Sequence, residues 1–64
     1  MAERRPNEVL IRLRGKRSRA DVARDLGITE RALQSYELGD RIPRDKVKTK
    51  IAEYYKRSVQ HIFF

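Results

Sequence analysis

Cationic side chains dominate the chemistry that this sequence can offer. Lys and Arg number 16 and Asp and Glu number 9, so the formal net charge is +7 at pH 7. A positive surplus of this size on a short chain attracts polyanions. DNA, RNA and an anionic membrane surface are all candidate partners, and charge alone does not choose among them.

The residue types that catalysis or metal binding requires are sparse. His61 is the sole histidine and the chain has no cysteine, so a zinc site would lack ligands. No Ser, His and Asp residues combine in a recognisable catalytic motif, and no glycine-rich phosphate loop occurs. We therefore expect no enzyme activity, no metal and no small-molecule cofactor.

The length of the chain sets its domain organisation. With 64 residues, of which 39% are hydrophobic, it forms one small domain at most. Lacking disulfides, this domain must draw its stability from apolar packing, helped by dimerisation. We expect residues 1–6 to be a flexible basic tail and residues 7–64 to be the folded domain.

No membrane-directed segment is expected in this sequence. No stretch approaches the ~20 apolar residues of a membrane span. Charged residues interrupt residues 1–13, which therefore lack the apolar core of a signal peptide. The expected compartment is the cytoplasm.

Apolar residues recur at helical spacing between Pro and Gly residues, and no segment alternates with a period of two. An all-α bundle of about five short helices is therefore predicted. Polar residues suited to capping helix starts stand at Asn7, Ser18, Thr29 and Ser58. Glycines suited to ending helices stand at Gly15, Gly27 and Gly39. The predicted helices cover residues 7–14, 18–26, 29–38, 45–55 and 58–63.

The same spacing predicts which side chains turn inward. In the first helix these are Leu10, Ile11 and Leu13, and in the loop before the fourth helix Ile42 should be tucked down. We assign Tyr54, Tyr55 and Phe63 to the core, and Phe64 to the core edge or a dimer contact. Lys46, Lys48 and Lys50 should form a solvated face, and Lys56 and Arg57 should complement a helix dipole.

The middle of the chain combines features of two helices that meet at a sharp corner. Helices joined at about 90–120° by a short turn approach closely near that corner. Ala23 is small enough for the approach, Gly27 accepts a positive φ, and Ile28 can anchor the turn. Leu33 and Tyr36 would hold the following helix to the body, leaving its other face free to enter a groove.

A resemblance to a known family is carried by residues 18–43, which read SRADVARDLGITERALQSYELGDRIP. This run resembles the Cro/C1-type (XRE) helix-turn-helix family, whose pattern is roughly S-Q-x-x-L-A-x-x-L-G-V-S-x-x-x-I-S-x-Y-E-N-G-x-R-x-P. Residues 50–63 are similar to the last two helices of the family. The resemblance implies a lambda-repressor-like fold. It also implies a DNA-binding transcriptional regulator, a repressor of the prophage or mobile-element kind, that places residues 29–38 in the major groove.

The resemblance further implies which side chains contact base edges. These lie on the exposed face of the recognition helix and are Glu30, Arg31, Ala32, Gln34 and Ser35. Arg31 can bridge O6 and N7 of guanine, and Glu30 can accept a hydrogen bond from N4 of cytosine. Ala32 can touch a thymine methyl group.

Phosphate contacts are implied for residues around that helix, namely Lys16, Arg17, Ser18, Arg19, Thr29, Gly39, Arg41 and Arg44. Two positions depart from the family pattern. Arg19 replaces a Gln that usually grips a phosphate, and its charge can serve the same purpose. Leu38 replaces an Asn before the loop glycine, so a backbone contact at Gly39 can persist whereas an Asn side-chain contact cannot.

A buried ion pair between Arg14 and Glu37 is also implied, joining the first helix to the end of the recognition helix. Such a pair fixes register more than it stabilises. Because the chain between residues 14 and 18 is short, Arg12 is an alternative partner for Glu37. In a second alternative, Glu37 lies on the surface near Arg41.

The leading hypothesis is a regulator that binds double-stranded DNA, as a homodimer on an inverted repeat. The alternative is a protein-interaction module, antitoxin-like or anti-regulator, that keeps the helix-turn-helix fold, although the charges at Arg19 and Arg31 argue against it. RNA or membrane-surface binding is a third possibility. The sequence offers neither an exposed aromatic platform nor a wide apolar helix face to support it.

Overall fold

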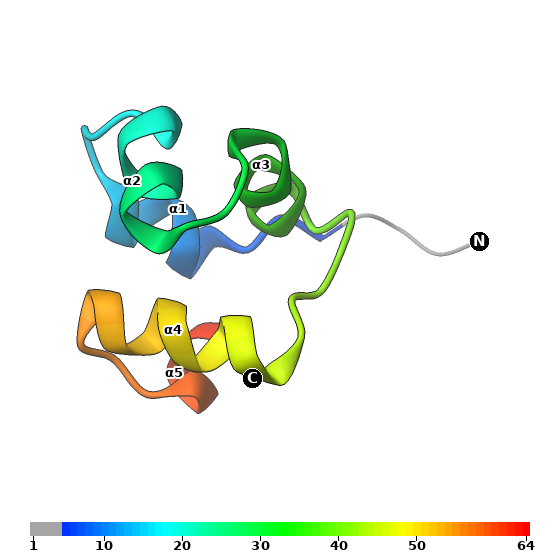
Figure 1. Cartoon of the computed structure of the whole chain (residues 1–64). Helices are drawn as coiled ribbons and strands as arrows, with labels where there is room; N and C mark the ends of the chain where they lie inside the picture. Colours follow the sequence, from blue (N-terminus) through cyan, green and yellow to red (C-terminus); the bar gives the residue numbers. More distant parts are fainter. Residues whose placement is uncertain (1–4) are drawn as a thin grey trace.

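Five α-helices and their short connections make up residues 5–64, the part of the chain that the computed structural model describes (Figure 1). The helices are α1 (Glu8–Arg14), α2 (Arg19–Leu26), α3 (Glu30–Leu38), α4 (Asp45–Tyr55) and α5 (Val59–Phe63). No strand occurs among these residues. The all-α prediction is confirmed, and the predicted helix bounds hold to within one residue. Most of the predicted tail, residues 1–4, lies outside the described part.

Side-chain caps start every helix but one. The side-chain oxygens of Asn7, Ser18, Thr29 and Ser58 each accept a hydrogen bond from the backbone N–H three residues later, at 3.0–3.1 Å. Each cap satisfies one of the N–H groups that a helix start leaves unpaired. Only α4 begins without such a cap, because Arg44 stands at its N-cap position and makes no capping hydrogen bond.

Left-handed residues end three of the helices. Gly27 has φ 71° after α2 and Gly39 has φ 80° after α3, as their C-cap prediction requires. Lys56 ends α4 in the same region, with φ 56° and ψ 45°. A residue with a Cβ adopts this conformation at a cost of roughly 1–2 kcal/mol. The sequence predicted that Lys56 complements the helix dipole. It did not predict that this residue also carries backbone strain.

The hydrophobic core is shared by all five helices. The α2–α3 pair packs above α4 and α5, and α1 contacts both α3 and α5 (Figure 1). The buried apolar side chains are Leu10, Val22, Ala23, Leu26, Leu33, Ile51, Ala52 and Ile62. Full burial of a Leu or Ile contributes about 1.5–3 kcal/mol relative to exposure. This shared core is therefore what holds α3 rigidly against the rest of the domain.

Two apolar residues lie differently from their predicted positions. Ile42, expected to be tucked down, is 79% exposed, and its neighbour Pro43 is buried instead. Successive side chains in an extended segment point to opposite sides, so only one of the two can turn inward. Ile11, expected on the inward face of α1, is 36% exposed because Leu10 occupies the position that points into the core.

The aromatic residues near the C-terminal end of the described chain line the edge of the core. Tyr54, Tyr55 and Phe63 are half-buried and pack against it, whereas Phe64 is 84% exposed. The ammonium group of Lys48 lies 4.9 Å from the centre of the Phe64 ring and 5.8 Å from that of Phe63. Lys48 is therefore half-buried and attached to the aromatic pair, and the predicted lysine face of α4 is solvated only in part.

Candidate DNA-binding surface

The corner between α2 and α3 rests on a small side chain and a left-handed glycine. Ala23 is 2% exposed, and its carbonyl accepts the backbone N–H of Ile28 at 3.0 Å. Gly27, between them, donates its N–H to Arg24 O at 3.1 Å. These bonds close the turn directly onto the end of α2, so α3 leaves the corner in a fixed direction.

One side of α3 is committed to the body of the domain. Leu33 and Glu37 are fully buried, and Tyr36 is half-buried against the core. The spacing of these residues, three or four positions apart, places them along a single stripe of the helix. The opposite side of α3 is therefore available to a ligand.

Most of the predicted base-contacting residues belong to that opposite side or to its margin, and Glu30 stands at the first turn of the helix. Glu30, Arg31 and Gln34 are exposed, whereas Ala32 and Ser35 are half-buried. The Thr29 hydroxyl accepts the backbone N–H of Ala32 at 3.0 Å and so fixes the start of the helix. The structure thus brings the predicted residues together, with the longest polar side chains at the N-terminal end of α3.

Arg14 and Glu37 form the ion pair that joins α1 to α3. Arg14 Nε lies 2.8 Å from Glu37 Oε2 and Arg14 Nη2 lies 3.2 Å from Oε1, a bidentate arrangement. The hydrogen bond to Glu37 raises the pKa of Arg14 above its ordinary value. Neither Arg12 nor Arg41 contacts the Glu37 carboxylate, so both alternatives to this pair are wrong.

Arg19 adds a second guanidinium to the same carboxylate. Its Nε lies 2.9 Å from Glu37 Oε1, and its side chain is 30% exposed whereas that of Glu37 is 0% exposed. Arg19 was predicted only as a phosphate contact, so sequence reasoning missed its role within the domain. The sequence shows that a charged residue replaces the usual Gln at the start of α2, but it does not identify Glu37 as the partner of that residue.

Tyr55 lies at the border of this charged cluster. Its buried hydroxyl has no hydrogen-bond partner among the described residues. Burial raises the pKa of Tyr55 above 10.0, the ordinary value for tyrosine, and Arg17 acts in the opposite direction. The neutral phenol is therefore the form that the fold favours.

The residues before α2 that are predicted to contact phosphates have different partners within the domain. Lys16 is exposed, and Ser18 caps α2 by accepting the N–H of Asp21 at 3.1 Å. Arg17 stacks on Tyr54, with the guanidinium carbon 5.0 Å from the ring centre. The Tyr54 hydroxyl in turn donates to Asp25 at 2.7 Å. Arg17 thus has an intramolecular partner on α4. The stack uses the face of the guanidinium, so the N–H groups at its edge can still bind a phosphate.

The predicted phosphate contacts after α3 lie on the loop to α4. Arg41 and Arg44 are exposed. The backbone N–H of Gly39 donates to Ser35 O as the helix cap. This bond uses the donor that was predicted to reach a phosphate, so a contact at Gly39 would require that N–H to be shared.

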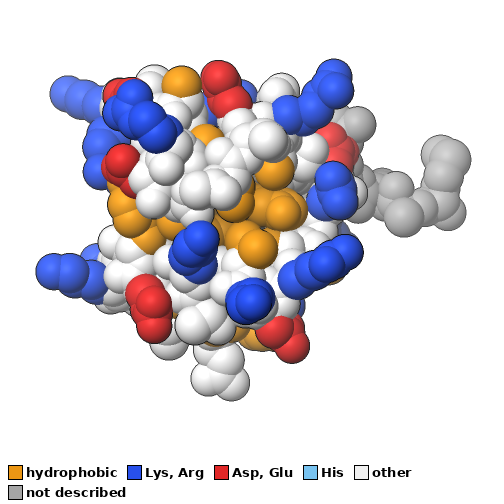
Figure 2. Space-filling model, in the orientation of Figure 1, with side chains coloured by type: hydrophobic (Ala, Val, Ile, Leu, Met, Phe, Trp, Pro, Cys, Tyr) orange, Lys and Arg blue, Asp and Glu red, His pale blue; other side chains and the backbone are white. Residues whose placement is uncertain are grey.

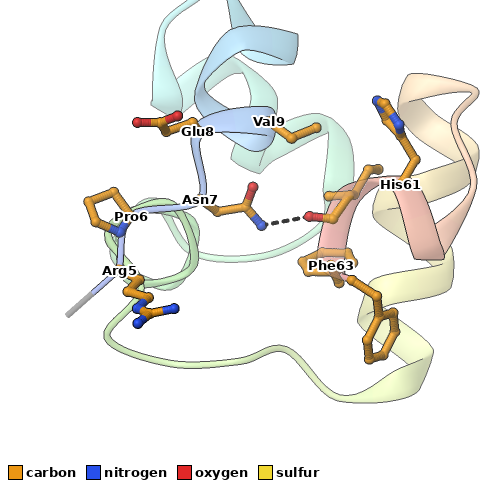
Figure 3. A pocket seen from close by; sticks show the side chains of 9 residues that line it. Arg5, Pro6, Asn7, Glu8, Val9, His61 and Phe63 are labelled. Carbon is orange, nitrogen blue, oxygen red and sulfur yellow. Dashed lines mark hydrogen bonds between the residues drawn. The ribbon is translucent and has the colours of Figure 1, made fainter. Parts of the chain in front are cut away.

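The chain before α1 closes the other side of this loop. A Cβ on Gly39 would collide with the backbone of Arg5, which makes glycine necessary here for space as well as for its φ. Asn7 donates its backbone N–H to Glu37 O at 2.8 Å, and its side-chain Nδ2 donates to Ile62 O at 2.9 Å (Figure 3). The residues before α1 are therefore joined to the end of α3 and to α5, beside an open hollow of about 370 Å³.

Lys, Arg, Asp and Glu side chains are interspersed on the face drawn in Figure 2. On the face drawn in Figure 2, Lys and Arg side chains surround an apolar seam between the α2–α3 corner and α4.

Among residues 5–64 no group of His, Cys, Asp and Glu is arranged to hold a metal ion. None of the helices described is both long and apolar enough to cross a membrane.

Comparison with known proteins identifies the family. A family model described as helix-turn-helix matches residues 10–62, most of the 64-residue chain. No curated protein and no solved structure gives a significant match. Members of this family are typically non-catalytic, and membership indicates DNA as the partner. The chain therefore belongs to the Cro/C1-type helix-turn-helix family and has its lambda-repressor-like, five-helix fold.

Proposed function

We propose that this protein is a sequence-specific transcriptional regulator that reads DNA by placing α3 in the major groove. The observation that carries this proposal is the division of α3 into two sides. Leu33 and Glu37 are buried, while Arg31 and Gln34 are exposed on the other side and Glu30 is exposed at the first turn of the helix. A B-DNA major groove about 12 Å wide admits one α-helix, and a helix anchored along only one side can enter it.

Arg31 is the main base-reading residue in this proposal. Its guanidinium is exposed and has no ion-pair partner among the described residues, so both of its Nη groups are available for O6 and N7 of guanine. Glu30 precedes it and accepts from cytosine N4. An acidic group facing a polyanion costs affinity at every non-cognate site, so Glu30 favours selectivity over binding strength.

Ala32 and Ser35 contact bases less directly, because both are half-buried. Phosphates flanking the groove are held by Lys16, Arg17, Ser18, Arg19, Thr29, Arg41 and Arg44, and by Gly39 if its backbone N–H is shared with Ser35 O. Contacts of this kind set the orientation of the protein on the duplex and carry no sequence information.

The regulator binds as a homodimer in this proposal, with its half-sites about one helical turn apart, or ~34–36 Å. The exposed Phe64 at 84% and the hollow beside α5 favour a contact between two copies at this end of the domain. Occupation of an operator by such a dimer excludes other proteins from the same DNA. We therefore propose repression, as in regulators of the prophage or mobile-element kind.

Selection of bound duplexes from random DNA tests this proposal. The expected result is one enriched motif with two-fold symmetry and a footprint of matching symmetry. Binding should retain its sequence preference as salt is raised, since base contacts depend less on salt than phosphate contacts. Only weak, salt-labile binding without a motif would refute the proposal and favour the alternative, a protein-interaction module.

A further inference from the structure

The carboxylate of Glu37 is the meeting point of three helices. Glu37 is fully buried near the C-terminal end of α3, and it accepts hydrogen bonds from Arg14 of α1 and Arg19 of α2. Two guanidinium groups on one carboxylate leave a local net charge of +1. Some of this positive charge is therefore not neutralised within the cluster.

The two arginines differ in how many of their donors are engaged. Arg14 uses all three nitrogens: Nε and Nη2 donate to Glu37, and Nη1 donates to Arg17 O at 2.7 Å. Its side chain is 17% exposed. Each of the three nitrogens of Arg14 thus has a partner inside the domain, and two of its five N–H groups remain.

Arg19 uses only Nε, which donates to Glu37 Oε1 at 2.9 Å. Within residues 5–64, no group accepts a hydrogen bond from Nη1 or Nη2 of Arg19, and its side chain is 30% exposed. The planar guanidinium places its donors in a fixed fork. A bond that holds Nε consequently sets the direction of the two Nη groups as well.

We infer that Glu37 is a positioning residue that holds Arg19 as a pre-formed phosphate clamp. Arg19 presents its free Nη pair to one phosphate at the start of α2, and its Nε remains on Glu37. The inference rests on the proposed DNA binding and deepens it. Because Glu37 also belongs to α3, the same carboxylate fixes the distance between this phosphate contact and the base-reading side of the recognition helix.

Pre-positioning should make Arg19 contribute more to DNA affinity than its charge alone would. An unrestrained arginine loses rotamer freedom when it binds a phosphate, whereas a restrained one has already lost it on folding. A lysine at this position would keep the charge but lose the fork, since an ammonium group is a point charge. The clamp and a simple charge effect therefore predict different results for the two substitutions.

The test compares Arg19→Gln and Arg19→Lys with the matched control Arg24→Gln. Arg24 lies on the same helix, and its exposed side chain forms an ion pair with Asp21 and with no other group of residues 5–64, so its loss changes net charge equally. Affinity for a selected duplex is measured by fluorescence anisotropy over a series of salt concentrations. The melting temperature of each variant, followed by circular dichroism, reports its folding separately.

For Arg19→Gln we expect an affinity loss of about tenfold beyond that of Arg24→Gln, and a slope of log K against log salt smaller by about 0.9, the value for one phosphate. Arg19→Lys should restore the slope but only part of the affinity. A Glu37→Gln variant should weaken binding in the wild-type background and have no further effect on the affinity of Arg19→Gln.

Three outcomes would overturn the inference. The first is a match between Arg19→Gln and Arg24→Gln in both affinity and slope. The second is a match between Arg19→Lys and the wild type. The third is a lowered melting temperature of the Arg19 variants with no change in affinity, as expected for a purely structural residue. If Glu37→Gln does not fold, the comparison of Arg19→Lys with the wild type still tests the inference. Failure of the wild type to bind any duplex would instead refute the proposed function.

Discussion

Ala23 is the residue on which the corner between α2 and α3 depends most directly, and Ala23→Leu tests that dependence. The side chain is 2% exposed, and its neighbours Val22, Leu26 and Leu33 are 0–2% exposed. Leucine adds three heavy atoms at a point where no space is open. The extra volume has to be accommodated by separating the helices or by forcing side chains out of their preferred rotamers.

The expected loss of stability from Ala23→Leu is about 1–3 kcal/mol, the usual range for overpacking a well-packed core. The free energy of unfolding of the whole domain is small: about 0.05–0.15 kcal/mol per residue gives roughly 3–10 kcal/mol for 64 residues. Each kcal/mol shifts the melting temperature of a domain of this size by about 4–8 °C. The variant should therefore melt at least several degrees below the wild type.

Ala20→Leu is the matched control for this experiment. Ala20 lies on the same helix and is exposed, so the substitution makes the same chemical change outside the core. Both variants are melted under circular dichroism, and their affinities for a selected duplex are measured well below either transition. Ala23→Leu should lose affinity as well as stability, because a displaced α3 no longer matches the groove. Equal melting temperatures for the two variants would refute the account of the corner.

Three further predictions address other parts of the molecule. Arg31→Ala should weaken binding to the selected duplex by about 1–3 kcal/mol and relax selectivity at one base pair; an unchanged motif after reselection would place the reading residue elsewhere. Lys56→Gly should stabilise the domain by up to about 1 kcal/mol, because glycine tolerates φ 56°; chemical denaturation measures this, and a loss of stability would contradict it. Above pH 10.0 stability should fall, because Tyr55 ionises more readily in the unfolded chain than in the fold, where burial raises its pKa; Tyr55→Phe should show a shallower decline, and an identical decline would exclude Tyr55 as its source.

The helix starts and the recognition helix are the features that sequence reasoning predicted best. Helix starts depend on a residue and the backbone three positions later, so Ser18 and Thr29 act through contacts that are local in sequence. The pattern of Leu33, Tyr36 and Glu37 is local in the same sense, since it follows from the helical repeat alone. Local rules of this kind need no knowledge of what lies across the core.

The features that sequence reasoning missed depend on residues distant in the chain. Whether Ile42 or Pro43 turns inward is decided by the surface beneath the loop. The collision that a side chain at Gly39 would make with Arg5 involves residues more than thirty positions apart. Arg19 is a similar case, since it reaches Glu37 across the α2–α3 pair. A charged residue was recognised there, but its internal partner could be found only once the helices were packed.

The position of Arg19 shows how one substitution relative to a family pattern can join two roles. A Gln at this site can hydrogen-bond a phosphate but brings no charge to Glu37. An Arg brings the charge, and Glu37, already paired with Arg14, can accept it because a carboxylate has about four lone-pair sites. The added cost of burial is limited, since 30% of the Arg19 side chain stays exposed. The same geometry leaves the Nη edge of Arg19 open, so the residue that ties α2 to α3 is also the one placed to meet the DNA backbone.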